Sequence, residues 1–539
     1  MVAPIIGVLT GLLIAAITFA VLRGLWAIVL PYYLRNHWAI VPGVTLGFFV
    51  TGLIMQYLTP NPNEHSTEEI IRSYHERQGD IDFKPFWFKL IAAVTTVGSG
   101  GSAALEGPSI YGGGSIGSWL WLRLRRLGLG PRDRRIMLIS GAAAGMAAVF
   151  RAPLTGIVFA LEMPYKDDLA HEALLPALIA SVVAYATLVG FVGPDPLFNF
   201  IGGTSFATID LAWSAALGAV CGVIAMVFAL TFRQARSFAV HAPIPHWAKM
   251  TIGGLLTGLC GLGFITLFPG PLIPLGPNYE AVGQVLAGHH GSVELLWFAG
   301  LKLAASLFTL GCGGVSAMFV PLFLTGASIG RACGQTIAHA SNLNLYAAVG
   351  MAAFIAAGYK APLTAVVFVA EATGGHAYII PSLIGAAVAY AISGEVSVSG
   401  DQHLHESIAI ADLSNITVGD VMNRDAISVR ADTTVEDFIH GTVAHNPHSV
   451  YPVCDEHGPI GVVSVALAGA IDPALWPTTR IDALADRDPV VVAPDYDLGE
   501  ALRLLINVAT RHMLIVAGAN GIQGIVTKSD ILRATRNVR

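Results

Sequence analysis

Residues 106–117 read EGPSIYGGGSIG and residues 151–162 read RAPLTGIVFALE, and both stretches return later in the chain. The second reappears as KAPLTAVVFVAE at 360–371, an offset of 209 residues. The first has a weaker echo, FVPLFLTGASIG at 319–330, at an offset of 213 residues. Two similar halves built from apolar, glycine-rich segments are typical of transporters with internal repeats. The sequence leaves open whether the halves run parallel or inverted.

The composition also indicates a membrane protein. Charged residues make up 12% of the 539 residues and the mean hydropathy is +0.64, whereas soluble domains carry about 25% charged residues. A net charge of -6 suggests no polyanionic partner, so nucleic-acid binding is not expected. The five cysteines lack CxxC spacing, which argues against a disulfide framework and a metal site.

Up to residue 405 the chain consists of apolar segments interrupted by Gly and Pro. The first of them, residues 2–31, is longer than a signal-peptide core and is interpreted as a retained membrane span. Many later segments are shorter than the roughly 20 residues that cross a bilayer. Such broken helices occur where they face protein or a water-filled cavity, typically at ion sites. Six arginines between residues 123 and 135 form a loop that the positive-inside rule assigns to the cytoplasm.

The composition changes near residue 406. Acidic residues become frequent, and short β-rich runs alternate with helical patterns in two similar blocks. We therefore expect a membrane domain at 1–405, a linker at 406–416, and two copies of a small soluble α/β module at 417–470 and 478–536.

Three stretches of the membrane part resemble the CLC family of chloride channels and anion/proton exchangers: EGPSIYGGGSIG, GAAAGMAAVFRAPLTGIVFALE and AAFIAAGYKAPLTAVVFVAE. The tail resembles a pair of cystathionine-β-synthase-type (CBS) domains in VGDVMNRDAISVRADTTVEDF, YPVCDEHGPIGVVS and GIVTKSDIL. The resemblance implies an α-helical multi-span membrane fold of CLC type, with two internal repeats and broken helices, followed by α/β tandem CBS domains. It also implies a homodimer in the bilayer of a bacterial or archaeal inner membrane, with the CBS domains in the cytoplasm.

Glu106 is the candidate gate. An acid inside a membrane is costly, so a function is the default interpretation. A helix beginning at Gly107 would present free N–H groups and a partial positive charge, which favour an anion. A carboxylate on this glycine hinge competes with the permeating anion and leaves when it is protonated or displaced by chloride. The resemblance gives Glu106 the place of the family's gating glutamate, but Leu105 replaces the family's arginine, so no fixed cation is expected to help hold the anion.

The resemblance also implies the remaining anion-site residues. The backbone N–H groups of Met318 and Phe319 match a second helix start that faces the anion. His65 is the best match for the family's serine loop by spacing, although Glu64 or Ser66 could occupy that place. The family's pore tyrosine should fall within residues 393–402, where there is none, and Ser399 is the closest substitute.

The coupling of chloride to protons is the open point. In exchangers of the family an inner relay glutamate follows the first APLTG helix; here Glu162 matches the preceding acid and Met163 falls on the relay position. A thioether cannot carry a proton. The sequence therefore favours passive or gated chloride transport, with a proton-coupled chloride/proton antiporter as the alternative.

Other classes of protein fit less well. A cation channel regulated by CBS domains would show acidic rings or a carbonyl filter motif, and neither is present. A membrane enzyme would need a Ser–His, paired-Asp or HExxH arrangement inside the spans, so an enzyme is not expected. A fluoride exporter is disfavoured because Pro108 completes the chloride-type Glu-Gly-Pro.

In the tail, Thr527 and Asp530 have the spacing that CBS domains use for an adenosine ligand. Asp530 would bind the ribose hydroxyls and Thr527 would lie near the phosphate of ATP, ADP or AMP. The first copy has Ser464 and Leu467 at the equivalent places, so a single nucleotide site is expected. An empty scaffold is the alternative.

Overall fold

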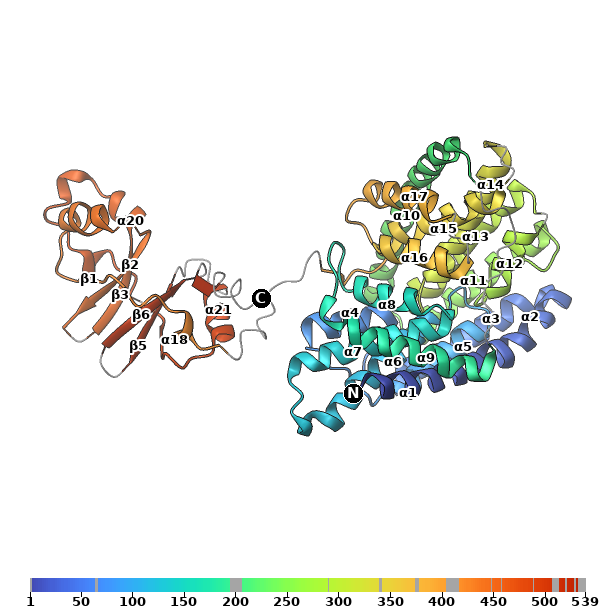
Figure 1. Cartoon of the computed structure of the whole chain (residues 1–539), viewed down its shortest axis with the longest axis horizontal. Helices are drawn as coiled ribbons and strands as arrows, with labels where there is room; N and C mark the ends of the chain where they lie inside the picture. Colours follow the sequence, from blue (N-terminus) through green and yellow to red (C-terminus); the bar gives the residue numbers. More distant parts are fainter. Residues whose placement is uncertain are drawn as a thin grey trace. The chain divides into compact units, whose positions relative to one another are not determined.

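The computed structural model of the protein describes residues 2–63, 66–193, 206–288, 290–338, 342–373, 378–403, 416–446, 448–456, 458–487, 489–506, 513–518, 521–527 and 530–531 (Figure 1). The chain divides into two compact units, Met1–Glu406 and Ser407–Arg539. Each unit is described by itself below.

The first unit is built from helices (Figure 1). In chain order they are α1 (Ala3–Thr18), α2 (Trp26–Arg35), α3 (Ile40–Leu58), α4 (Ser66–Glu76), α5 (Phe86–Gly98), α6 (Glu106–Leu124), α7 (Pro131–Phe150), α8 (Pro153–Glu162), α9 (Leu174–Val192), α10 (Thr208–His241), α11 (His246–Leu267), α12 (Tyr279–Ala287), α13 (Ser292–Gly311), α14 (Phe319–Thr336), α15 (Leu343–Tyr359), α16 (Pro362–Thr373) and α17 (Ile379–Ile392). A π-helical segment, Phe19–Leu25, joins α1 to α2.

Helix lengths confirm the expected mixture of complete and broken spans. Six helical stretches within the described residues are long and apolar enough to cross a bilayer. Those six are Ala3–Arg35, His37–Leu58, His171–Val192, Thr208–His241, His246–Leu267 and Ser292–Gly311. The helices that carry the repeated motifs are shorter: α8 has 10 residues and α16 has 12. Both are too short to cross a bilayer alone.

Equivalent backbone breaks separate the short helices in the two halves. After α7 the chain turns at Arg151 (φ 52°), and after α15 it turns at Lys360 (φ 57°), both in the left-handed region. Pro153 and Pro362 then occupy the first turns of α8 and α16, where a missing N–H costs nothing. The positions differ by 209 residues, so the repeat seen in the sequence is also a repeat of backbone geometry.

Glycines let the helices of each half pack backbone against backbone. A Cβ added at Gly113 of α6 would lie 2.0 Å from the carbonyl oxygen of Gly141 in α7. The second half repeats the contact, because a Cβ at Gly326 of α14 would lie 2.1 Å from the carbonyl oxygen of Gly350 in α15. No other side chain fits such a distance without moving a helix.

The two halves are joined by reciprocal caps. The Glu162 carboxylate at the end of α8 accepts hydrogen bonds from the N–H groups of Leu363 (2.9 Å) and Thr364 (2.8 Å) at the start of α16. Glu371 of α16 returns the contact by accepting from the N–H groups of Leu154 (3.1 Å) and Thr155 (2.8 Å) of α8. The end of each helix meets the start of the other, so the two helices are antiparallel and the halves are inverted. Glu162 is therefore a helix cap, which satisfies orphan donors.

The second unit holds two sheets of the same design (Figure 1). In each sheet the first strand is parallel to the second and the second is antiparallel to the third. The strands are β1 (Val429–Arg430), β2 (Val450–Asp455), β3 (Gly458–Ser464), β4 (Val491–Val492), β5 (Met513–Gly518) and β6 (Gly521–Thr527), and the helices are α18 (Val418–Val421), α19 (Val435–Asp437), α20 (Val465–Gly469) and α21 (Leu498–Ile506). The prediction of two α/β copies is confirmed.

The two copies exchange short segments. Val418 packs into the apolar core of the second sheet with Leu498 and Leu514, and the Asn423 N–H donates to the carbonyl of Ile525 at 2.9 Å. Ile481 packs into the core of the first sheet. The second unit is therefore assembled from both copies together, although its domain limits along the sequence stay a prediction.

Candidate functional site

The starts of α6 and α14 meet at a short antiparallel bridge between the two halves. Ala104 and Ala317 form the bridge, and the Ser316 hydroxyl donates to the carbonyl oxygen of Ala104. A Cβ added at Gly107 would lie 2.5 Å from the carbonyl carbon of Ser316, so only glycine allows this approach. Two helix N-termini, whose first N–H groups have no partner within their own helix, therefore converge on one place. Helix α6 begins at Glu106, one residue before the predicted start.

Glu106 lies across this junction and is completely buried. Its Oε1 accepts a hydrogen bond of 2.7 Å from the backbone N–H of Phe319, the first residue of α14. Its Oε2 has no hydrogen-bond partner among the described residues. The carboxylate from one half thus rests on the helix start of the other half, at an N–H predicted to face the anion.

The Tyr359 hydroxyl binds the second backbone N–H group that was predicted to face the anion. The backbone N–H of Met318 donates to the Tyr359 hydroxyl at 2.9 Å, and Tyr359 is the last residue of α15. The sequence predicts a pore tyrosine only near the end of the membrane part, so Tyr359 is a site residue that the sequence does not predict. Its position directly before the break at Lys360 was the available signal, because a residue at a helix end can direct its side chain into a junction.

A cavity of about 40 Å³ adjoins Met318 and Tyr359, which is room for roughly three water molecules. It is lined by Thr67, Glu68, Phe232, Arg236, Leu310, Ser316, Ala317, Met318, Tyr359, Val398 and Ser399. Ser399, the predicted substitute for the tyrosine, is buried here and its hydroxyl has no partner among the described residues. His65 and the alternative Glu64 lie outside the described residues, as does the side chain of Ser66.

Lys302 is a basic residue near the junction that the sequence did not predict. It is completely buried on α13, and its Nζ donates to the carbonyl oxygens of Pro274 and Gly276, both at 3.4 Å. It also interacts electrostatically with Glu106. Leu105 therefore does not leave the junction without a basic group, since one arrives from a distant helix that spacing alone could not connect to Glu106.

Met163, the residue at the relay position, is buried and is not among the described residues that line the cavity. Its carbonyl oxygen accepts from the side-chain amide of Gln402 at 3.1 Å, and the same amide donates to the carbonyl of Tyr359 at 2.9 Å. Gln402 thus fixes the chain after α8 against the end of α15. Nothing in this arrangement transfers a proton through residue 163.

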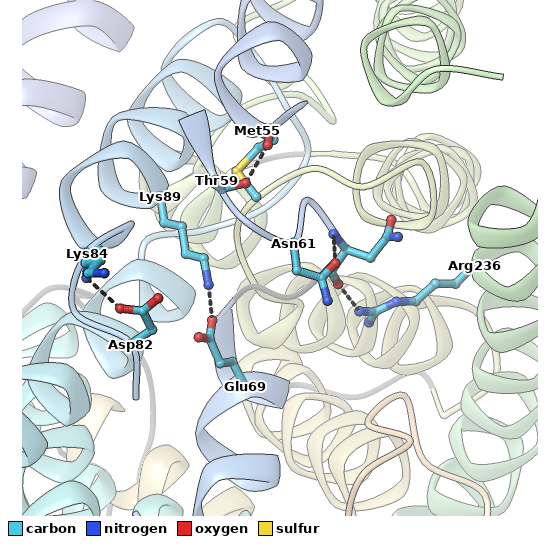
Figure 2. A network of polar contacts seen from close by, with 9 residues as sticks. Met55, Thr59, Asn61, Glu69, Asp82, Lys84, Lys89 and Arg236 are labelled. Atoms are coloured by element: carbon cyan, nitrogen blue, oxygen red, sulfur yellow. Dashed lines mark hydrogen bonds and ion pairs between the residues drawn. The ribbon is translucent and has the colours of Figure 1, made fainter. Parts of the chain in front are cut away.

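Charged residues gather around the first turn of α4 (Figure 2). Lys89 of α5 forms a buried ion pair with Glu69 at 2.5 Å. Arg236 of α10 reaches the loop before α4, where it donates to the carbonyl oxygen of Asn63 at 3.5 Å (Figure 2), and it also forms an ion pair with Glu68. None of these four charged residues is among the site residues predicted from the sequence.

In the second unit, Thr527 and Asp530 bind one another. The Asp530 carboxylate accepts from the Thr527 N–H at 3.0 Å and from the Thr527 hydroxyl at 2.6 Å. Thr417 and Asp420 make the same pair of contacts, at 2.9 and 2.7 Å. A threonine three residues before an acid is a helix-capping arrangement. The spacing that suggested a ligand therefore also has a local structural use.

Comparison with known proteins agrees with this architecture. Residues 46–394 match the family described as voltage gated chloride channel, and residues 418–466 and 481–537 match the CBS domain. The H(+)/Cl(-) exchange transporter ClcA of Yersinia pestis is 30% identical over 306 residues. That alignment covers 55% of this chain and 62% of the length of the relative.

Two solved structures share the fold. A CLC-type fluoride/proton antiporter has a TM-score of 0.65 at 20% identity, over 75% of this chain and 97% of its own. A eukaryotic CLC transporter has a TM-score of 0.61 at 18% identity, over 98% of this chain and 97% of its own. The second comparison extends the similarity through the tail.

Proposed function

The chain belongs to the voltage-gated chloride channel (CLC) family of membrane anion transporters, and from that premise we propose that it exchanges chloride for protons, with Glu106 as the group that both ions engage. It is a multi-pass membrane protein with two CBS domains and is not an enzyme.

The position of Glu106 on the Phe319 N–H carries the proposal. An ionised carboxylate in this place is a tethered competitor for an anion, because both are stabilised by the same helix N-terminus. Protonation removes its charge and weakens its hold on the N–H group. Each proton that binds Glu106 therefore favours an anion at the helix start, so the two ions are coupled at one place.

Proton-coupled exchange replaces the passive transport that Met163 suggested. The relative named above is an exchanger of H(+) and Cl(-), and Glu106 supplies a protonatable group at the junction. Passive chloride conduction remains the second candidate, since Met163 cannot relay a proton.

Exchange predicts uphill proton movement. Purified full chain in liposomes with a chloride gradient and no proton gradient should pump protons against the pH difference it creates, at a fixed ratio to chloride. A chloride electrode and a pH electrode read both fluxes in the same vesicles. Chloride flux without proton movement would establish passive transport instead. Proton movement driven by fluoride but not by chloride would identify fluoride as the exchanged anion.

We propose further that the protein is a homodimer whose CBS domains lie on the cytoplasmic side. His403, the last described residue of the first unit, stacks on His75 of α4 with ring centroids 3.8 Å apart. The adjacent Tyr74 lies 4.2 Å beneath the guanidinium of Arg135, in the first turns of α7, where the arginine-rich segment 123–135 ends. The chain therefore leaves the first unit on the side of that basic loop, which the positive-inside rule makes cytoplasmic.

We also propose one adenine nucleotide per chain at Thr527 and Asp530. CBS domains can bind adenine nucleotides, and Asp530→Ala should weaken ATP, ADP or AMP binding by about tenfold to hundredfold, because a charged hydrogen-bond partner contributes about 1.5–3 kcal/mol. Calorimetry on the full chain in detergent measures the change. Asp420→Ala is the matched control, since it removes the same Thr–Asp cap elsewhere. Equal affinities in both variants would assign Asp530 to capping alone.

A further inference from the structure

The cavity beside Met318 and Tyr359 contains one ion pair. Among its described lining residues, Glu68 is the single acid and Arg236 the single cation, and their side chains form an ion pair. The Glu68 side chain keeps 20% of its surface exposed and that of Arg236 keeps 24%. Both side chains therefore keep part of their surface open to the cavity that they line.

The surroundings of Glu68 are nearly balanced in charge. Besides Arg236, it interacts electrostatically with Arg72 and Asp401, which form their own ion pair at 3.0 Å. The Tyr359 hydroxyl is a further titratable group at the cavity. In a partly desolvated site, removing one charge leaves its partner unpaired at high cost. A proton on Glu68 would leave Arg236 in that condition unless another anion took its place.

We propose that Glu68 and Arg236 form a second ion site, at which a proton binds Glu68 as a halide replaces its carboxylate on Arg236. The proton bonds to a carboxylate oxygen and the ion pair breaks, while the halide pairs with the guanidinium. One positive and one negative charge enter together, so the net charge of the cavity does not change. The inference rests on the proton exchange proposed above.

Glu68 supplies a proton acceptor that the relay position lacks. Met163 has no titratable group, whereas Glu68 shares its cavity with the Tyr359 hydroxyl. That hydroxyl accepts from the Met318 N–H, next to the N–H that holds Glu106. Only this cavity therefore separates a proton on Glu68 from the junction that holds Glu106. A halide on Arg236 would occupy the same cavity as the helix start at Met318.

The direction of α4 is consistent with a proton acceptor that is reached from the inner side of the membrane. Helix α4 begins at this cavity and ends beside the arginine-rich loop, where Arg135 covers Tyr74. The loop that follows α4 is tied to the same region, since the Ser118 hydroxyl donates to the carbonyl of Gly79 at 2.7 Å. Helix α4 therefore runs from Glu68 to the side predicted to be cytoplasmic, and protons are expected to reach Glu68 from that side.

Glu68→Gln tests the proposal in the liposome assay with both electrodes. Proton flux should fall by about 10²-fold, the usual contribution of a positioned proton-transfer group, while chloride flux continues. Glu68→Asp keeps the acid and should restore part of the proton flux. Glu294→Gln is the matched control, because Glu294 has a side chain of similar exposure (22%) paired with His290 and is not a cavity residue.

The outcomes separate this inference from the proposed function. If the unchanged protein moves no protons, the exchange proposal fails and the inference fails with it. If it exchanges and Glu68→Gln keeps the same proton-to-chloride ratio, the exchange stands and Glu68 is not the acceptor. If a variant shows no transport, a second measurement tests the site. Chloride is added to the unbuffered protein in detergent, and the number of protons taken up is measured. A smaller uptake than in Glu294→Gln supports the site, and an equal uptake overturns it.

Discussion

Glutamine in place of Glu106 should raise chloride flux, remove its dependence on pH and stop proton movement. The carboxylate oxygen now accepts from the Phe319 N–H at 2.7 Å. A neutral amide keeps the shape but has no charge with which to compete against an anion. A hydrogen bond to a charged group contributes about 1.5–3 kcal/mol, against about 0.5–1.5 kcal/mol for a neutral one, so occupancy of the helix start by residue 106 should fall by about tenfold.

The sign of the pH effect follows from the same competition. In the unchanged protein, lowering the external pH protonates Glu106, frees the helix start and increases chloride flux. Glu106→Gln should show the high flux at every pH. Glu280→Gln is a suitable control, because Glu280 is also an acid in the first turn of a helix but is solvent-exposed. Retained pH dependence and proton movement in Glu106→Gln would exclude Glu106 as the shared group.

Features that depend on local sequence were predictable. The repeated Ala-Pro-Leu-Thr motif marks a helix start. Its proline, and the residue with a left-handed backbone conformation before the motif, recur in both halves. Glu106 could be found because an acid among glycines in an apolar segment has few structural uses. Met318 and Phe319 followed from resemblance to a second helix start. These inferences required only residues close together in the chain.

The rest of the site depends on contacts between distant helices. Tyr359 reaches Met318 from the end of α15, and Lys302 interacts with Glu106 from α13. Both supply chemistry that the family's usual positions lack in this sequence. Glu68 and Arg236 are separated by most of the first half and meet only in the folded chain. Spacing along one helix contains no information about such pairs.

Alanine at Gly113 should prevent the first half from packing. Its Cβ would lie 2.0 Å from the carbonyl oxygen of Gly141, a backbone atom that cannot move without its helix. Overpacking costs about 1–3 kcal/mol, and a contact with backbone belongs at the upper end. We expect a lower apparent melting temperature in detergent and little chloride flux, because a displaced α6 carries Glu106 away from Phe319.

Two further alanine variants identify the cause. Gly190→Ala places a Cβ on α9 with nothing within 4 Å, so its stability and flux should be unchanged. Gly326→Ala in the second half meets the carbonyl oxygen of Gly350 at 2.1 Å and should reproduce the loss. Equal apparent melting temperatures of the Gly113→Ala and Gly190→Ala variants would show that α6 and α7 tolerate a wider separation. Loss in both repeat variants would instead mean that the junction requires close packing in each half, since Glu106 and Phe319 begin the two helices that those glycines position.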